Sequence, residues 1–254
     1  SNNVILENLV SSSGNRCYGQ TYGCESEFFI TNTNNVIFQD SIFGTIKMGN
    51  SHNVELSNVN VGGGHPNYGY GIISIADRSS NINIHDSTFT SLNTAGGLFG
   101  TNYAEDGSCS PHMVPQICAS VGEIGTGIKI SDNTVLGHVN FHSVTDAPIT
   151  ISGNTFTNVY GCSIQFQAGT TGSNLWGYGG HIIKNNIFNC SEGVNTISIT
   201  GNPGNEISGN TFHYGGQAIF LIGSQNNMIT NNNFMGSTLT YTAGDLYHDV
   251  YLAP

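Results

Sequence analysis

The sequence contains few charged side chains. Only 8% of its 254 residues are Asp, Glu, Lys or Arg, and Lys and Arg together number 5. With 16 Asp and Glu residues the formal net charge is -11, which opposes binding to nucleic acids, anionic lipids and polyanionic substrates because like charges repel. We therefore expect no nucleic-acid partner.

Long apolar runs are missing too. No run approaches the roughly 20 residues that a membrane-spanning helix needs, so we expect no membrane span. The sequence begins without a signal-peptide pattern, which indicates a mature product or an excised fragment. Asn, Ser and Thr must cover the surface in place of charge.

What the sequence does have is one short motif repeated along nearly its whole length. Its clearest copy, at 148–156, reads Pro-Ile-Thr-Ile-Ser-Gly-Asn-Thr-Phe, and we expect Ile149, Ile151 and Phe156 to point inward. Nine copies share an apolar anchor, namely Leu6, Phe38, Leu56, Ile84, Ile130, Ile151, Ile183, Ile207 and Ile229. The steps between anchors are 32, 18, 28, 46, 21, 32, 24 and 22 residues, which is typical of a solenoid. The step of 46 is either two rungs or one rung with a long insertion.

A second strand with the same period-two alternation precedes each anchor. Examples are 28–30 before 36–38, 73–75 before 82–84, and 197–199 before 205–207. The Asn, Gly, Ser and Thr clusters between them, such as 31–35 and 201–205, favour turns. Each rung is thus a strand, a turn, a strand, an Asn-containing turn and a third short stretch. Stacked rungs then form parallel sheets.

The Ile-Ser-Gly-Asn-Thr-Phe repeats resemble those of the right-handed parallel β-helix superfamily. That superfamily includes pectate lyases, polygalacturonases, alginate epimerases and the repeat proteins related to periplasmic copper-binding β-helix proteins. The resemblance covers roughly 4–234 and implies an all-β, right-handed parallel β-helix of nine to ten rungs. It is specific for the fold and unspecific for activity. Calcium as a cofactor is implied by this resemblance only.

A buried Asn ladder at one turn is a further implication of the resemblance. The matching positions here are Asn133, Asn154, Asn186, Asn210 and Asn232. Ser41 and Ser87 replace the Asn in two earlier rungs, and Val59 breaks the ladder.

The six cysteines indicate an oxidising compartment. Cys17 and Cys24 bracket one short loop, and Cys109 and Cys118 bracket another, so both pairs could be local disulfides. Cys162 and Cys190 occupy what look like equivalent parts of consecutive rungs, which suggests a disulfide between rungs. The alternative is that some of the six are buried free thiols. Their spacing does not suggest zinc.

Four segments interrupt the repeat, at 11–25, 62–71, 92–127 and 168–180, and a tail follows at 237–254. We interpret 1–254 as one domain whose insertions project from a rigid scaffold, where binding residues usually lie. Tyr68, Tyr70, Trp176 and Tyr178 are flanked by Gly and suit stacking on a sugar ring. The alternative is that they pack against the outside of the helix.

The best candidate for a set of titratable side chains that act together is His138, His142 and Asp146. The two histidines lie at either end of one predicted strand and on the same face, so a general acid/base pair or a metal site is conceivable. The alternative is two solvent-facing histidines beside a turn Asp. Our expectation is no metal and no assignable catalytic residue.

These observations favour an extracellular or cell-surface structural or adhesive protein that binds carbohydrate. The alternative is a polysaccharide lyase, glycoside hydrolase or epimerase, although the sequence shows no cluster of acidic and basic residues for such chemistry. The chain enters its first rung at Val4 and Leu6 without a polar cap. Because an open rung exposes strand edges and apolar side chains, we expect self-association through the helix ends. The alternative is that an upstream cap has been removed.

Overall fold

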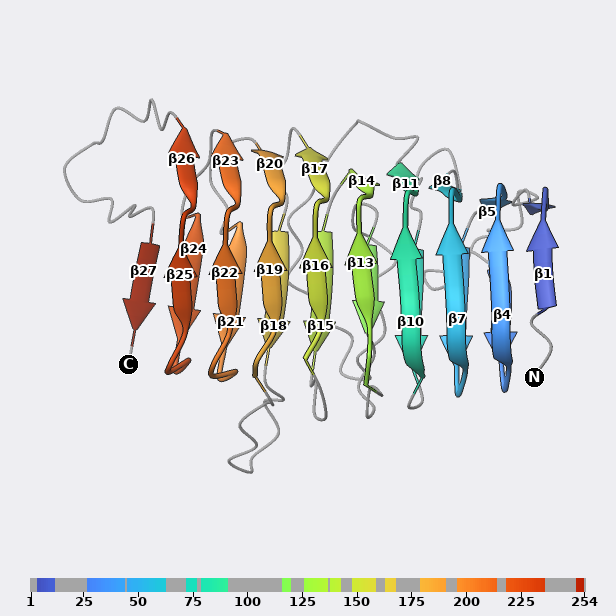
Figure 1. Cartoon of the computed structure of the whole chain (residues 1–254), viewed down its shortest axis with the longest axis horizontal. Helices are drawn as coiled ribbons and strands as arrows, with labels where there is room; N and C mark the ends of the chain where they lie inside the picture. Colours follow the sequence, from blue (N-terminus) through green and yellow to red (C-terminus); the bar gives the residue numbers. More distant parts are fainter. Residues whose placement is uncertain are drawn as a thin grey trace, which may run out of the picture.

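A computed structural model describes residues 4–11, 27–43, 45–62, 72–76, 79–90, 116–119, 126–136, 138–142, 148–158, 163–167, 179–190, 196–213, 218–235 and 250–253. These residues form 27 strands in three parallel sheets of nine strands each, which we call A, B and C. The rungs succeed one another along the long axis of the molecule, with the two termini at opposite ends (Figure 1).

Sheet A contains the repeat anchors. Its strands are β1 (Val4–Glu7), β4 (Asn34–Gln39), β7 (His52–Ser57), β10 (Ser80–His85), β13 (Lys129–Ser131), β16 (Thr150–Ser152), β19 (Ile182–Lys184), β22 (Glu206–Ser208) and β25 (Met228–Thr230). Sheet B is formed by the stretch that follows each anchor. Its strands are β2 (Val10–Ser11), β5 (Ile42–Phe43), β8 (Asn60–Gly62), β11 (Thr88–Thr90), β14 (Thr134–Val135), β17 (Thr155–Asn158), β20 (Ile187–Cys190), β23 (Thr211–His213) and β26 (Asn233–Met235).

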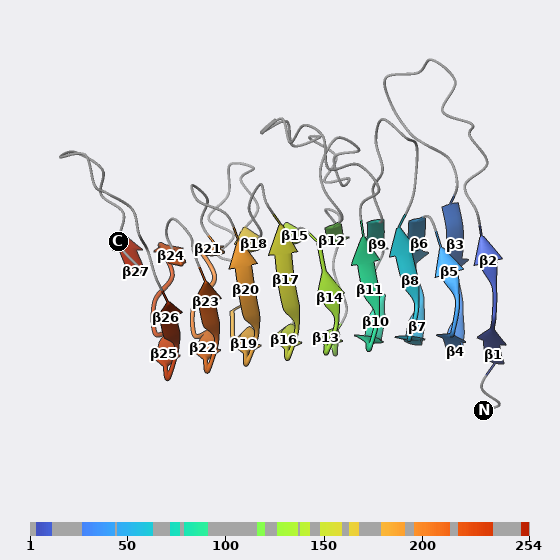
Figure 2. The ribbon, with the colours of Figure 1, turned by 90° about the horizontal axis from the view of Figure 1, so that it is seen from above.

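Sheet C is formed by the strands that precede the anchors from the second one onward, and by β27 after the last anchor. Its strands are β3 (Glu27–Thr31), β6 (Thr45–Gly49), β9 (Ile72–Ala76), β12 (Gln116–Ala119), β15 (His138–His142), β18 (Ser163–Gln167), β21 (Ile197–Thr200), β24 (Ile219–Ile222) and β27 (Val250–Ala253). Figure 2 shows these nine strands side by side in that order. The predicted parallel sheets are confirmed, and their nine strands each agree with the predicted nine to ten rungs.

Strand register answers the question left open by the 46-residue step. Ile84 of β10 pairs directly with Ile130 of β13, so this step is one rung with a long insertion. The insertion contains β12, which pairs with β9 on one side and β15 on the other. Likewise β27, within the predicted tail, extends sheet C beyond β24. The repeat therefore continues into two segments that the sequence pattern did not identify as strands.

The core is a narrow apolar column. Ile149, Ile151 and Phe156 are all buried, as predicted from their alternation. On the inner side of sheet B, four phenylalanines stack nearly parallel: the ring centroids of Phe156 and Phe188 are 4.9 Å apart, those of Phe188 and Phe212 5.0 Å, and those of Phe212 and Phe234 5.1 Å. Each rung thus packs chiefly on its neighbours above and below.

The corner between sheets A and B always consists of two residues. The first has a positive φ in every rung, a conformation that only Gly, Asn and Asp adopt readily. The residues are Asn8, Asp40, Asn58, Asp86, Asp132, Gly153, Asn185, Gly209 and Asn231. This requirement explains the Asn, Asp or Gly that follows the strand in each copy of the motif.

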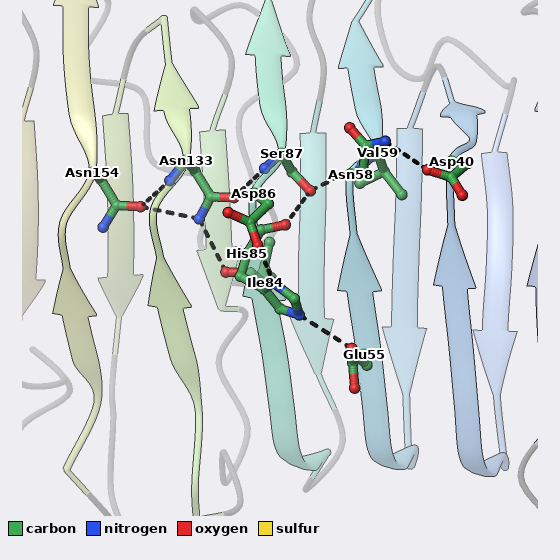
Figure 3. Close-up of polar contacts among 10 residues, drawn as sticks. All are labelled: Asp40, Glu55, Asn58, Val59, Ile84, His85, Asp86, Ser87, Asn133 and Asn154. Atoms are coloured by element: carbon green, nitrogen blue, oxygen red, sulfur yellow. Dashed lines mark hydrogen bonds and ion pairs between the residues drawn. The ribbon is translucent and has the colours of Figure 1, made fainter.

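The second corner residue forms the predicted Asn ladder. Both the backbone N and Nδ2 of Asn133 donate to Oδ1 of Asn154 at 3.0 Å (Figure 3). Asn154 donates in the same way to Asn186. Asn186 continues the pattern to Asn210, and Asn210 to Asn232. The predicted ladder is confirmed.

The predicted irregularities of the ladder are confirmed as well. Ser87 receives a bond from the backbone N of Val59 at its Oγ and donates its own backbone N to Oδ1 of Asn133. Ser41 likewise accepts from the backbone N of Leu9. Val59 is buried but offers no side-chain acceptor, so the ladder is interrupted there.

A second ladder was missed by the sequence analysis. Ile149, His181, Asn205 and Asn227 occupy one inward position at the start of consecutive sheet A strands. The backbone N of Ile149 donates to Nδ1 of His181, and the backbone N of His181 donates to Oδ1 of Asn205. His181 also stacks on Phe166, with 4.0 Å between ring centroids. It is therefore a core residue and not a surface histidine.

Both end strands expose apolar side chains. Val10 is 71% exposed near the N-terminal end and Leu252 is 66% exposed near the C-terminal end. Val4 is also exposed. Exposed apolar side chains at both ends are what the expected self-association requires, and that self-association stays a prediction.

The register makes a direct prediction about Ile151 and its neighbour Thr150. Ile151→Asp places an unpaired charge among buried side chains, so we expect a loss of about 4 kcal/mol in the free energy of unfolding or failure to fold. Thr150→Asp lies on the outer face of the same strand and should cost less than about 1 kcal/mol. Denaturant unfolding measures both changes, and equal losses would contradict the assigned register.

Candidate functional site

Sheet C contains the strand on which the two predicted site histidines lie. In β18 and β21 the buried side chains are Ile164 and Phe166, and Ile197 and Ile199. Val139 and Phe141 of β15 pair in register with Ile164 and Phe166 and so occupy core positions. His138 and His142 lie at the two ends of β15, where their backbones pair with Ser163 and Gln167, and their side chains lie outside the described part of the structure. Asp146 lies outside the described residues.

The spacing of these histidines bears on their joint role. Four residues separate them along one strand, which corresponds to about 13 Å between their Cα atoms. Their predicted role as an acid/base pair or metal site stays a prediction.

The predicted aromatic contacts adjoin two strands of the same sheet in the sequence. Tyr68 and Tyr70 belong to the connection 63–71, which leads directly into β9, whereas Trp176 and Tyr178 belong to the connection 168–178, which leaves β18. All four lie outside the described residues. All strands of sheet C run in one direction. The first connection joins the N-terminal end of a strand and the second joins the C-terminal end of another, so they join opposite ends of the strands. Along the helix axis β9 and β18 are three strand spacings apart, about 14 Å.

The second aromatic connection rejoins the helix at a constrained point. A Cβ on Gly179 would lie 1.4 Å from the carbonyl oxygen of Pro203, so only glycine fits there. Gly180 has a φ of +78°, and its backbone N donates to the same carbonyl at 2.9 Å. The residue that follows Tyr178 is thereby fixed against the corner of the next rung.

The predicted disulfides cannot be placed by side-chain geometry. Cys17, Cys24, Cys109 and Cys162 lie outside the described residues, and the side chains of Cys118 and Cys190 lie outside them too, so all three pairs stay predictions. The backbone does correct one premise. Cys190 pairs in register with Asn158, four residues before Cys162, so Cys162 and Cys190 are not at equivalent positions of their rungs.

A polar cluster that the sequence did not indicate lies on sheet A. His85 at the end of β10 bonds through Nε2 to Oε1 of Glu55 at 3.2 Å and through Nδ1 to Oδ2 of Asp86 at 2.7 Å (Figure 3). The side chains of His85, Glu55 and Asp86 are 23%, 40% and 68% exposed. Thirty residues separate Glu55 from His85, so only the register of β7 against β10 brings them together.

Two opposing effects set the charge of His85. Its partial burial lowers its pKa, but hydrogen bonds to Asp86 and Glu55 and the negative charges of both carboxylates raise it, and the net pKa is above the ordinary value. The neighbouring outward residues in register are the neutral Ser57 and Ser131. An imidazole held in this way can take up and release a proton near neutral pH.

Among the residues that the structure describes, no group of three or more His, Cys, Asp or Glu side chains is arranged to hold a metal ion. Nor does any helix within the described segments have the length and apolar character to cross a membrane.

Comparison with known families agrees with the fold. Residues 137–245 match the family model described as right handed beta helix region. The three parallel sheets extend the same architecture through the rungs before the match, so the chain is a right-handed parallel β-helix solenoid. No curated protein matches the sequence. The predicted fold is confirmed.

The raised pKa of His85 predicts how stability depends on pH. A group with a raised pKa in the folded state contributes stability that is complete below its unfolded pKa, about 6.5, and is lost as pH rises through the folded value. We expect Glu55→Gln to lower the free energy of unfolding by up to about 1 kcal/mol at pH 5.5. By pH 8 the difference from the unsubstituted protein should be much smaller.

A matched control lies in the same outward column of sheet A. Glu206 accepts a hydrogen bond from Ser208 instead of a histidine, so Glu206→Gln should produce no comparable change between pH 5.5 and 8. Urea unfolding across this pH range measures both variants. An equal pH dependence for the two would show that His85 does not respond to Glu55.

Proposed function

We propose that this protein is an extracellular or cell-surface β-helix of structural or adhesive role that binds carbohydrate along the outer side of sheet C. The observation that carries the proposal is topological. His138 and His142 lie on β15, and both aromatic connections adjoin sheet C, within the stretch from β9 to β18. Residues found separately in the sequence thus lie on a strand of sheet C or adjoin its strands in the sequence, which supports the proposal.

The chemistry of these residues suits a sugar polymer. Aromatic rings offer a flat apolar surface for a sugar ring, and imidazole can donate to or accept from its hydroxyls. The stretch from β9 to β18, about 14 Å, is long enough for several sugar units of an extended chain. Support for the extracellular setting comes from the six cysteines and the low charge content.

Binding is better supported than catalysis. A lyase, hydrolase or epimerase needs a base or an acid placed within a few ångströms of the reacting bond. The one described group of His with carboxylates, Glu55, His85 and Asp86, lies on sheet A and not on sheet C. The proposal is therefore recognition without turnover.

The single tryptophan allows a direct test. If Trp176 contacts the ligand, titration with a bound glycan should shift its fluorescence, and no other Trp contributes to the signal. Trp176→Ala should weaken binding by about 5- to 150-fold in isothermal calorimetry, because one aromatic stacking contact contributes about 1 to 3 kcal/mol. Tyr178→Ala, which keeps the fluorophore, should weaken it to a similar extent.

The control variant is placed on another sheet. Asn233 of β26 is exposed on sheet B, and Asn233→Ala should leave glycan affinity unchanged. A panel of neutral, acidic and amino-sugar polysaccharides that neither shifts the fluorescence nor releases heat would rule out the carbohydrate-binding function.

A further inference from the structure

A regular row of outward side chains runs along sheet B. In five successive strands, β11, β14, β17, β20 and β23, the first residue pairs in register with the first residue of the next strand (Figure 1). These residues are Thr88, Thr134, Thr155, Ile187 and Thr211, which we call the threonine row. Thr134 and Ile187 are exposed, and the other three are partly buried. All five are β-branched, and the threonines present a hydroxyl group beside a methyl group.

Each residue of the threonine row is fixed by its neighbours in the chain. The residue before it occupies the buried corner ladder, and the residue after it is buried, namely Phe89, Val135, Phe156, Phe188 or Phe212. The backbone N of Thr155 donates to the carbonyl oxygen of Asn133 in the rung before at 2.8 Å, and the same bond recurs along the row at 2.8 to 2.9 Å. Beneath the row, the ring centroids of Phe156 and Phe188 are 4.9 Å apart and those of Phe188 and Phe212 are 5.0 Å apart. Because β-branched side chains have restricted χ1 angles, the row is a rigid and evenly spaced array.

Strand propensity alone does not account for the threonine row. β-branched residues are favoured on strands in general, yet the outward positions of sheet A in the same five rungs are mixed. One column there consists of Asn83, Lys129, Thr150, Ile182 and Glu206, and the other consists of His85, Ser131, Ser152, Lys184 and Ser208. The uniform row is therefore particular to sheet B.

Sheet B also differs from the other two sheets in charge. None of its nine strands contains Asp, Glu, Lys or Arg. Sheet A has Glu55 and Lys129 among its strand residues, and sheet C has Glu27 and Lys47. A charged group such as the Lys ammonium holds its own hydration shell strongly. The strands of sheet B hold no such group, so the threonine row lies on a face without charged side chains.

From this array we propose that sheet B binds the surface of ice through the threonine row. Ice is an uncharged crystal whose donors and acceptors repeat in fixed rows, so the surface that matches it must itself be rigid, periodic and uncharged. Threonine hydroxyls donate to and accept from water, and the adjoining methyl groups contribute apolar contact. Because the row is already ordered in the free protein, binding costs little side-chain entropy. The proposal concerns a different sheet from the carbohydrate-binding proposal and does not depend on it.

The size of this face argues against a second copy of the chain as its occupant. The strands of sheet B contain two to four residues each. Nine of them present a face of about 38 Å by about 10 Å. Its area, about 400 Å², is half of the roughly 800 Å² that each partner buries in a stable protein complex. A long and narrow face of this kind is better matched by an extended crystal surface.

Slow freezing of a dilute solution measures ice binding directly. A protein that binds ice enters the growing crystal, whereas an ordinary solute stays in the liquid. We expect the unsubstituted protein to be enriched in the ice fraction relative to serum albumin in the same solution, as measured by gel densitometry. It should also slow the recrystallisation of small ice crystals at a concentration at which albumin has no effect.

Lysine substitutions locate the binding surface. Thr134→Lys and Thr155→Lys should each lower the ice-bound fraction at least about fivefold, because a strongly hydrated ammonium group holds the row away from the crystal. Thr230→Lys, at an exposed position of sheet A, adds the same charge and should leave the ice-bound fraction unchanged. Urea unfolding of the three variants verifies that each is folded.

Three results would overturn the proposal. The first is a distribution of the unsubstituted protein between ice and liquid that equals that of albumin. The second is an equal ice-bound fraction for Thr134→Lys, Thr155→Lys and Thr230→Lys. The third is adsorption to crystalline chitin or cellulose that Thr134→Lys abolishes, without enrichment in ice, which would assign the row to a polysaccharide surface. Glycan titration of Trp176 tests the function of sheet C separately from all three.

Discussion

A hydrogen bond from the backbone of one rung to an Asn side chain of the next is the interaction on which this fold depends. At the corner of sheets A and B, each ladder Asn from Asn154 onward accepts two bonds from the rung before it and returns one from Nδ2 to a carbonyl of that rung, as Asn154 does to Ile130. These groups are buried, and an unpaired donor there costs about 1 to 3 kcal/mol. The ladder therefore fixes the register of every rung that it joins.

The same constraint explains where the chain can vary. Every corner between sheets A and B contains two residues, whereas the connections that enter and leave sheet C range from one residue, between β5 and β6, to 25 residues, between β11 and β12. Insertions at the ladder corner would separate the buried Asn side chains, but insertions beside sheet C leave both the ladder and the core intact. The insertions that contain the candidate aromatic contacts accordingly adjoin strands of sheet C in the sequence.

The fold was predictable because the ladder and the core leave a periodic trace. Apolar anchors, the Asn, Asp or Gly at positive φ and the Asn after it recur in most rungs, which predicted the three strands per rung and the burial of Ile151. Two strands were missed, β12 and β27, because long insertions separate them from their neighbours and hide the period. His181 was missed because its position holds Ile149 in the rung before and Asn205 in the rung after. The cluster of Glu55 and His85 was unpredictable for another reason, since register alone joins residues 30 positions apart.

Replacing Asn154 by Val tests the central role of the ladder most directly. Valine fits this column, since Val59 occupies it in an earlier rung, but it removes the acceptor for the backbone N and Nδ2 of Asn133. We expect the free energy of unfolding in urea to fall by about 2 to 4 kcal/mol, whereas Asn189→Val, exposed on sheet B, should change it by less than about 0.5 kcal/mol. Equal, small changes for both variants would contradict the account.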